Sequence, residues 1–303
     1  MSQLAQQIVA AVGQSLRGKE DAVEFAVIAL LAGGHILIED HPGVGKTLLA
    51  KSLARALDLP FQRVQCTADL LPSDILGAQV YHPRTGELTF RPGPVFTSVL
   101  LADELNRTPP RTQSALLECM AERRVTIDRE SHALPEPFFV VATQNPLTAA
   151  GTYPLPENQL DRFLLSIRLG YPDFEHEIDV VASEDGHRLV EELRPIAARE
   201  DLLAARRAVD AVRCDRELTA FVVQLAQATR RSGDAVLGVS TRGAQALHRA
   251  CRARAHVHGR DFVVPDDVRA LLVPTWSHRL SVRPGTDPDA ILHEILAQTP
   301  LPD

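Results

Sequence analysis

The chain has 303 residues, a formal net charge of −7 and 45% hydrophobic residues. These values are typical of a globular protein of about two domains, and the acidic balance disfavours a protein whose main role is to coat nucleic acid. No apolar run approaches the roughly 20 residues of a membrane helix, and residues 1–4 lack a signal-peptide layout, so we expect a cytoplasmic protein. The scattered cysteines indicate neither a disulfide framework nor a zinc site.

Short apolar runs alternate with helical patterns up to about Gly170, which predicts an α/β fold with a mainly parallel sheet covered by helices. After a break at 171–173, apolar residues recur with helical spacing, as they do over 218–225. We therefore predict an α/β domain over 1–170 and an all-helical domain over 171–303. The five expected strands occupy 35–39, 61–65, 99–102, 138–143 and 164–169.

A glycine-rich segment follows the first expected strand and reads Glu-Asp-His-Pro-Gly-Val-Gly-Lys-Thr over 39–47. This is the pattern of a phosphate-binding loop (P-loop), although Asp40 stands where the usual G-x-x-x-x-G-K-[ST] pattern has its first glycine. Lys46 would reach the β and γ phosphate oxygens, and Thr47 would bind Mg²⁺ at the start of a helix. The expected nucleotide contacts are Pro42, Gly43, Val44, Gly45, Lys46, Thr47 and Leu48.

Two acids, Asp103 and Glu104, end the apolar run that begins at residue 99. Beside a P-loop this is the Walker B arrangement, in which Asp103 would hold Mg²⁺ and Glu104 would polarise a water for attack on the γ-phosphate. A further apolar run leads to Asn145, which would lie beside Glu104 if the strands are neighbours. These residues predict an ATPase that uses ATP and Mg²⁺.

Two arginines are placed where a loop or a helix could carry them to phosphate. Arg162 follows Leu-Asp, and Arg242 would lie in the first turn of a helix capped by Ser240. An exposed surface position is the commoner place for an arginine, so the residue pattern alone assigns neither role.

Several longer stretches together resemble the MoxR family of AAA+ ATPases. Besides 39–47, they are Ala-Asp-Glu-Leu-Asn-Arg-Thr-Pro-Pro at 102–110, Thr-Gln-Ser-Ala-Leu-Leu-Glu at 112–118, Ala-Thr-Gln-Asn-Pro at 142–146, Gly-Thr-Tyr-Pro-Leu-Pro-Glu at 151–157 and Leu-Asp-Arg-Phe at 160–163. The resemblance covers nearly the whole chain and places it in the helix-2-insert branch. It implies a P-loop αβα sandwich with a five-stranded sheet, followed by an all-α lid domain.

The resemblance also implies residue roles. Asn145 would be sensor 1, Arg162 the arginine finger that reaches a neighbouring subunit's site, and Arg242 the sensor 2 arginine of the lid. Gly18 and Lys19 would lie beside the adenine. Residues 81–90 would form the hairpin inserted after helix 2, and 124–134 a hairpin that projects toward a ring pore.

Active rings of such proteins are usually hexamers. The resemblance further implies chaperone-like remodelling, often with a partner that carries a von Willebrand factor A domain, in which client proteins are matured or receive cofactors. The residues do not identify the client.

Two alternatives remain open. The first is a nucleotide-dependent switch or scaffold that hydrolyses ATP poorly, which a measurement of basal turnover would separate from a motor. The second is a nucleic-acid translocase, suggested by four arginines in the lid, although a solvated basic helix face explains them better. They are Arg249, Arg252, Arg254 and Arg260. Metal binding by His256 and His258 would lack a third ligand.

Overall fold

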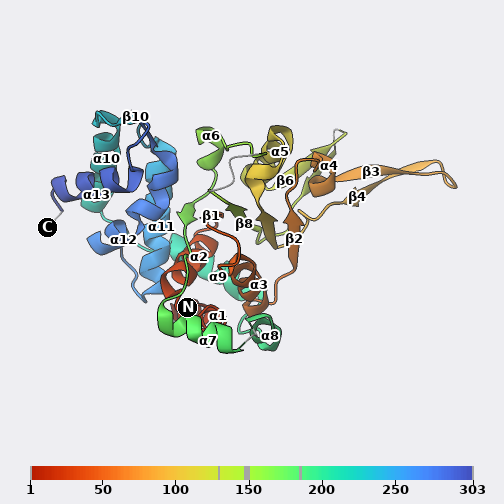
Figure 1. Cartoon of the computed structure of the whole chain (residues 1–303), viewed down its shortest axis with the longest axis horizontal. Helices are drawn as coiled ribbons and strands as arrows, with labels where there is room; N and C mark the ends of the chain where they lie inside the picture. The colour runs from red at the N-terminus through yellow and green to blue at the C-terminus, as the bar shows by residue number, and fades with distance from the viewer. Residues whose placement is uncertain (1, 129, 147–150, 184–185, 302–303) are drawn as a thin grey trace.

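The computed structural model describes residues 2–128, 130–146, 151–183 and 186–301. Its centre is a five-stranded, fully parallel sheet in the order β2-β5-β8-β1-β9 (Figure 1). The strands are β1 (Ile36–Glu39), β2 (Phe61–Gln65), β5 (Val99–Asp103), β8 (Phe139–Gln144) and β9 (Leu165–Ile167). The five expected strands are therefore confirmed, with ends that differ by two residues or fewer.

Two hydrophobic cores lie on opposite faces of this sheet, because side chains alternate along each strand. Ile36 and Ile38 of β1 belong to one core, and Leu37 belongs to the other. The first core contains α1 (Ser2–Gly13), α2 (Glu20–Leu31) and α3 (Lys46–Ala56), and the second contains α5 (Pro110–Glu122). The sheet thus lies between two layers of helices, which confirms the predicted αβα sandwich.

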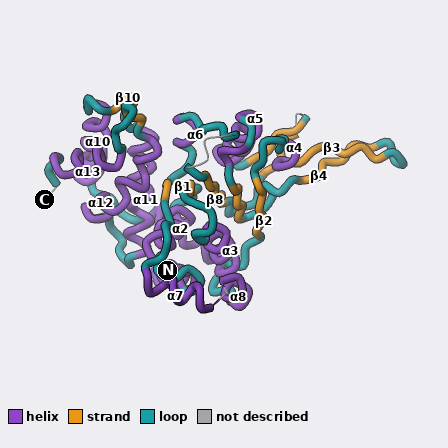
Figure 2. Tube along the Cα trace, viewed as in Figure 1, coloured by secondary structure: helices purple, strands orange, loops and turns teal. Residues whose placement is uncertain are grey.

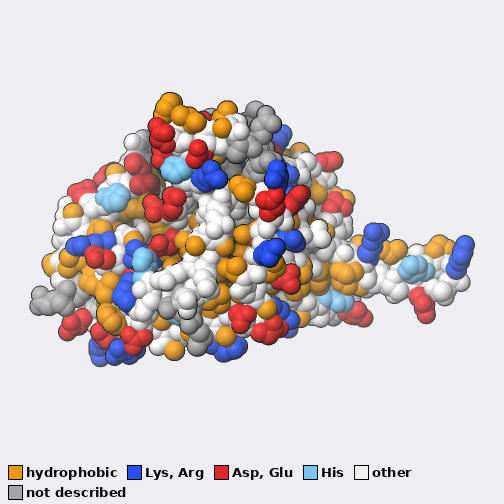
Figure 3. Space-filling view, turned by 90° about the horizontal axis from the view of Figure 1, so that it is seen from below, with side chains coloured by type: hydrophobic (Ala, Val, Ile, Leu, Met, Phe, Trp, Pro, Cys, Tyr) orange, Lys and Arg blue, Asp and Glu red, His pale blue; other side chains and the backbone are white. Residues whose placement is uncertain are grey.

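Two antiparallel hairpins extend the α/β part. β3 (Gly77–His82) and β4 (Glu87–Pro92) form an arm that projects far from the body, with α4 (Pro72–Leu76) at its base (Figures 1 and 3). β6 (Arg124–Ile127) pairs with β7 (Glu130–Ala133). The rings of Phe90 and His132 stack with centroids 4.1 Å apart, which joins the two hairpins. Both hairpins expected from the resemblance are present.

Beyond β9 the described chain is mainly helical (Figure 2). A short antiparallel ladder of β10 (Ala235–Leu237) and β11 (Ser281–Val282) lies among the helices, an addition to the all-helical prediction. Strands of this length are too short to produce a periodic pattern. The remaining elements are η1 (Leu105–Arg107), α6 (Glu157–Leu160), α7 (Phe174–Ser183), α8 (Gly186–Glu192), α9 (Arg199–Asp210), α10 (Arg216–Arg231), α11 (Thr241–Val257), α12 (Pro265–Trp276), η2 (Ser277–Arg279) and α13 (Pro288–Gln298).

The first core continues from the sheet into helices α9 to α13, so both parts of the chain share one hydrophobic interior. The helix that follows the predicted division at residue 170 supports this view, because α7 lies beside α1 in Figure 1 rather than among α10 to α13. The division into domains at residue 170 therefore stays a prediction. None of the helices within the described ranges has the length and apolarity that a membrane crossing requires.

The arginines expected on a solvated lid face are engaged inside the protein instead. Arg254 and Arg260 both donate to Asp267, which is fully buried, at 2.7 to 2.8 Å. Arg252 donates to the carbonyl oxygen of Val212 at 2.8 Å. For these three residues the solvated-face interpretation is wrong. Their guanidinium groups are hydrogen-bonded to the buried carboxylate of Asp267 and to the carbonyl oxygen of Val212, both of which need a donor inside the protein.

Candidate active site

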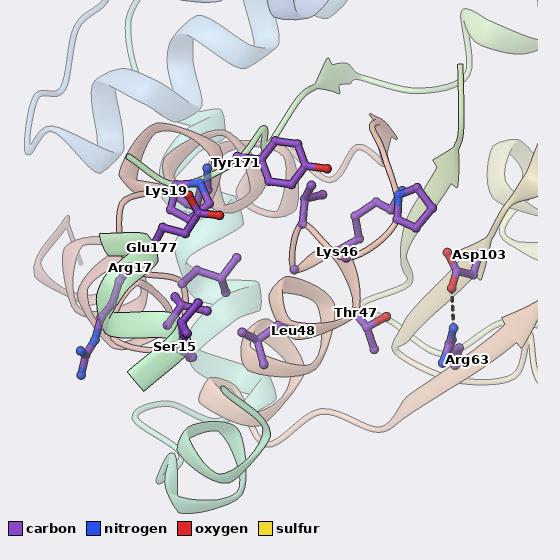
Figure 4. A pocket seen from close by; sticks show the side chains of 18 of the residues that line it. Ser15, Arg17, Lys19, Lys46, Thr47, Leu48, Arg63, Asp103, Tyr171 and Glu177 are labelled. Atoms are coloured by element: carbon purple, nitrogen blue, oxygen red, sulfur yellow. Dashed lines mark hydrogen bonds and ion pairs between the residues drawn. The ribbon is translucent and has the colours of Figure 1, made fainter. Parts of the chain in front are cut away.

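A cavity of about 680 Å³ lies at the carboxyl edge of the sheet, where β1 leads into α3. All seven P-loop residues from 42 to 48 line it (Figure 4). Gly43 and Gly45 have φ values of 87° and 98°, a backbone region that glycine enters without steric cost. Because α3 begins at Lys46, the free N–H groups of its first turn face this cavity, as anion binding requires.

Asp40 explains the missing first glycine of the P-loop pattern. Its buried carboxylate accepts hydrogen bonds from the N–H groups of His41 (2.8 Å), Leu169 (2.8 Å) and Gly170 (2.6 Å). The backbone of Asp40 is not in the left-handed region, so glycine is not needed there. The side chain ties the start of the loop to the segment after β9.

Lys46 points along the loop and donates from Nζ to the carbonyl oxygen of Asp40 at 2.6 Å. Burial lowers the pKa of Lys46, and the nearby carboxylates of Asp103, Asp40 and Glu104 oppose that shift. The partly buried ammonium group of Lys46 would interact strongly with an incoming anion, because less water is present to screen its charge.

Asp103 ends β5 with both carboxylate oxygens occupied. Oδ1 accepts from the Thr143 hydroxyl at 2.7 Å, and Oδ2 accepts from Arg63 Nη2 at 2.6 Å (Figure 4). Thr47 and Asp103 line the same cavity and offer the hard oxygen ligands that Mg²⁺ prefers. Across the described parts of the chain there is no group of three or more His, Cys, Asp or Glu that could hold a metal. One hydroxyl and one carboxylate, from Thr47 and Asp103, fit a Mg²⁺ ion that takes its other ligands from nucleotide phosphates and water.

Glu104 follows Asp103 in the left-handed backbone region, with φ at 58°. Its N–H donates to Thr143 Oγ1 at 2.8 Å, and its Oε2 accepts from Gln65 Nε2 (3.2 Å) and Arg107 Nη1 (3.0 Å). A non-glycine residue at positive φ carries strain that the surrounding bonds must hold. These contacts keep the Glu104 side chain on the cavity wall next to Asp103.

The two residues expected beside the adenine have different surroundings. Lys19 lines the cavity, and burial lowers its pKa against the opposing charge of Asp40. Gly18 is not among the lining residues. A Cβ at Gly18 would lie 3.0 Å from the ring of His176, so this glycine permits close packing of α7 at a φ of 70°.

Three of the predicted residues lie outside the cavity. Asn145 follows the end of β8 but lines a separate hollow of about 250 Å³. Arg162 is exposed and donates from Nη1 to the Leu117 carbonyl at 3.0 Å. Arg242 is exposed in the first turn of α11, where Ser240 Oγ caps the N–H of Gly243 at 3.0 Å as expected. The structure gathers the P-loop, the acids and Lys19, and leaves these three elsewhere.

Sequence reasoning missed several cavity residues. Arg63 and Gln65 end β2, the strand beside β5, and the carboxyl end of a parallel strand could have marked them. Val180 and Val181 reach the cavity from α7, and Tyr171 from the loop before it. No pattern within α7 indicates which of its faces meets the P-loop.

Comparisons with known proteins agree with this arrangement. Residues 35–165 match the ATPase family associated with various cellular activities (AAA), and 227–295 match the AAA lid domain. The chain is 46% identical to the uncharacterized protein YeaC of Bacillus subtilis, covering 94% of this chain and 91% of YeaC. It is 36% identical to Chaperone MoxR1 of Mycobacterium tuberculosis, covering 94% of this chain and 79% of that protein.

Two further similarities extend the same result. Protein MoxR of Methylorubrum extorquens is 32% identical, with 90% of this chain and 86% of that protein covered. A crystal structure of a candidate ATPase from Cytophaga hutchinsonii superposes with a TM-score of 0.92 at 35% identity, covering 100% of this chain and 96% of that one. With the fold, the P-loop cavity and these relatives in agreement, the chain belongs to the MoxR family of AAA+ ATPases.

Proposed function

We propose that this chain hydrolyses ATP with Mg²⁺ and uses the energy to remodel client proteins. The observation that carries the proposal is the meeting of the P-loop with Asp103 and Glu104 in one cavity. P-loop N–H groups and Lys46 would bind the phosphates, and Thr47 and Asp103 would hold Mg²⁺. The ion, when bound, neutralises phosphate charge.

Glu104 would orient the attacking water and accept its proton as the γ-phosphate bond breaks. For this task its carboxylate must leave Gln65 and Arg107, both of which are exposed enough to move. Asn145 would complete the water position from the end of β8. Arg63 would have to release Asp103 when the ion enters.

We further propose a closed ring, in keeping with the family a hexamer, in which a neighbour completes each site. Arg162 supports this because it is exposed and lies outside its own cavity. Arg242 is likewise outside the cavity. Gly243 beside it faces Arg279, since a Cβ at Gly243 would lie 3.1 Å from Arg279 Cδ, and Arg279 in turn donates to Asp161. Arg279 thus links the two segments that carry Arg162 and Arg242, and we assign both arginines to the neighbouring subunit's nucleotide.

The remaining expectations are proposals from family membership. They are chaperone-like maturation of a client, a partner with a von Willebrand factor A domain, and a cytoplasmic location. The printed name of Chaperone MoxR1 supports the first of these. The engagement of Arg252, Arg254 and Arg260 within the lid gives no support to the nucleic-acid alternative.

Phosphate release from ATP by the purified protein tests the activity, with and without Mg²⁺. We expect Glu104→Gln to bind ATP yet lose roughly 10²–10⁴-fold in turnover, the range typical of a lost general base. Lys46→Ala should lose nucleotide binding itself. Matched controls are Glu118→Gln on the exposed face of α5 and Lys51→Ala on α3, neither of which lines the cavity. If Glu104→Gln turned over ATP as fast as the unmodified chain, the mechanism would be rejected. If the unmodified ring bound ATP without hydrolysing it, the nucleotide-dependent switch would be favoured.

A further inference from the structure

Arg279 is a buried arginine that holds the turn carrying Arg162. It ends η2, and its side chain is only 4% exposed. Nε donates to Asp161 Oδ1 at 2.7 Å, and Nη2 donates to the carbonyl oxygens of Asp161 (3.3 Å) and Phe163 (2.5 Å). Nη1 donates to the carbonyl oxygen of Leu164 at 3.1 Å. One guanidinium therefore binds the chain on both sides of Arg162.

The surroundings make this contact rigid. His278 is half-buried, with Nε2 3.1 Å from the Phe163 carbonyl oxygen and 2.9 Å from Arg279 Nη1. Burial and the charge of Arg279 hold the pKa of His278 well below its usual value, so the ring is neutral. The cluster thus contains one cation and one anion, Arg279 and Asp161. A planar guanidinium with several fixed acceptors has little orientational freedom.

The opposite side of Arg279 contacts the lid helices. A Cβ at Gly243, in the first turn of α11, would lie 3.1 Å from Arg279 Cδ. Trp276, at the end of α12, donates from Nε1 to the carbonyl oxygen of Gly243 at 2.8 Å. A displacement of α11 and α12 would therefore move Arg279 and, with it, the turn at 161–164.

Arg162 has few contacts of its own that could replace this support. Among the residues that the structure describes, its exposed guanidinium makes one hydrogen bond, to the carbonyl oxygen of Leu117. The turn follows the single helical turn of α6, which is only four residues long. The backbone bonds to Arg279 therefore set where the Arg162 side chain begins and in which direction it leaves the subunit.

We propose that Arg279 is the positioning residue of Arg162, coupling the lid of one subunit to the nucleotide site of its neighbour. The inference rests on the proposed role of Arg162 in the shared site. Arg279 would touch neither nucleotide nor Mg²⁺, and acts through the turn at 161–164.

Mixed rings with one kind of working site provide the test. A donor subunit carries Lys46→Ala, so that it lacks a working P-loop but supplies Arg162. An acceptor subunit carries Arg162→Ala and supplies the intact P-loop. Arg279→Lys, which keeps the charge and loses the planar fork, is then placed in the donor or in the acceptor. Subunit exchange is confirmed with labelled chains before ATPase activity is measured.

We expect Arg279→Lys in the donor to lower mixed-ring activity on the order of 10²-fold, as for a misplaced reacting group, and to change nothing in the acceptor. A merely structural role would act equally from either subunit. Asp161→Asn keeps the backbone contacts and should cost about 10-fold from the donor alone, because the ion pair weakens but the turn stays bonded. This milder variant also carries the test if Arg279→Lys does not fold.

Arg254→Lys in the donor is the matched control. Arg254 is a lid arginine bound to Asp267 at 2.7 Å, and within the described residues it makes no hydrogen bond or ion pair with 161–164. The control should leave activity unchanged. Full activity with both donor variants, or equal losses from donor and acceptor, would overturn the inference. The inference would also be wrong if Arg279→Lys and Asp161→Asn subunits fail to assemble into mixed rings while Arg254→Lys subunits assemble normally. Full hydrolysis by Arg162→Ala rings alone would instead reject the shared site.

Discussion

The nucleotide cavity and the arginine-bearing turns differ in how complete each is within one chain. The cavity collects the P-loop, Asp103, Glu104 and Lys19, and most of these side chains have partners nearby. Arg162 and Arg242 are exposed and lie outside it. Binding of phosphate therefore needs only local structure, whereas the proposed chemistry needs a second copy of the chain.

The largest expected effect tests whether the arginine-bearing turn of one subunit reaches the nucleotide cavity of its neighbour. Arg162→Ala should keep ATP binding and lose about 10³-fold or more in turnover, the range known for arginine fingers. ATPase activity per subunit of the unmodified chain should rise with protein concentration as rings form. Arg168→Ala is the control, because Arg168 is exposed, does not line the cavity and lies outside the turn at 161–164. A dilute monomer that turns over at the full rate would contradict the comparison.

The local character of the cavity explains how much of it could be predicted. A P-loop is a short stretch whose glycines and lysine have their roles in sequence order, and buried parallel strands are continuous apolar runs. The contact of Arg63 with Asp103 joins residues 40 positions apart, and that of Arg279 with Phe163 joins residues 116 apart. Such pairs depend on strand order and on lid packing, which a single sequence does not display.

Side chains close together in sequence are also hard to assign from the sequence alone. Lys19 lines the cavity while Gly18 packs against α7, although the resemblance treated them as a pair. Asp40 stands where the P-loop pattern has a glycine, and the sequence does not indicate that its carboxylate accepts hydrogen bonds from three N–H groups. The direction in which a side chain leaves a loop is decided by tertiary contacts, and these two positions could not be assigned in advance.

The second prediction concerns the bond between the cavity and the segment after β9. Asp40→Ala would leave the N–H groups of Leu169 and Gly170 without their acceptor. Each unsatisfied buried group costs about 1–3 kcal/mol, so we expect a loss of about 2–4 kcal/mol in the free energy of unfolding. Denaturant unfolding measures this loss. Asp21→Ala, at an exposed position in the first turn of α2, serves as the control. An equal effect of the two changes would show that the Asp40 carboxylate does not stabilise this connection.

A third prediction concerns His35, which lies in the buried interior just before β1. His35 joins α5 to the sheet, since Val140 N–H donates to Nδ1 at 3.0 Å and Nε2 lies 3.3 Å from the Met120 carbonyl oxygen. Burial lowers the pKa of His35 to about 3. Below pH 6.5 the unfolded chain takes up a proton that the folded protein does not. Stability should therefore fall from about pH 6.5 toward pH 3, by up to about 1.4 kcal/mol per pH unit from this residue.

Unfolding free energies between pH 6 and pH 4 check that slope. Carboxylates and His278 also contribute to the pH dependence in every variant. The quantity to compare is therefore the difference in slope between variants. His35→Asn should be less stable at pH 7 and should show a shallower dependence on pH. His293→Asn, on the exposed side of α13, should retain the slope of the unmodified chain. Identical slopes in all three proteins would show that His35 does not titrate as argued.

The smallest expected effect lies inside the cavity, where Arg63 occupies an oxygen of the proposed Mg²⁺ ligand. The pair is half-exposed on the Arg63 side, so its strength is limited by solvent screening. Replacing Arg63 with Met keeps the apolar stem and removes the competing charge. We expect the Mg²⁺ concentration that gives half-maximal ATPase activity to fall by about 2- to 5-fold, in line with the modest worth of such pairs.

Arg91→Met, on the exposed hairpin strand β4, controls for the loss of a positive charge and should leave the Mg²⁺ dependence unchanged. Arg63→Met distinguishes two roles for this guanidinium. If it competes with Mg²⁺, less metal suffices and turnover at saturation is kept. If instead turnover collapses at saturating Mg²⁺, Arg63 acts on the phosphates, and the cavity would hold a cationic catalytic group within one subunit. That second outcome would weaken the contrast between a locally complete binding site and a chemistry completed by the neighbour.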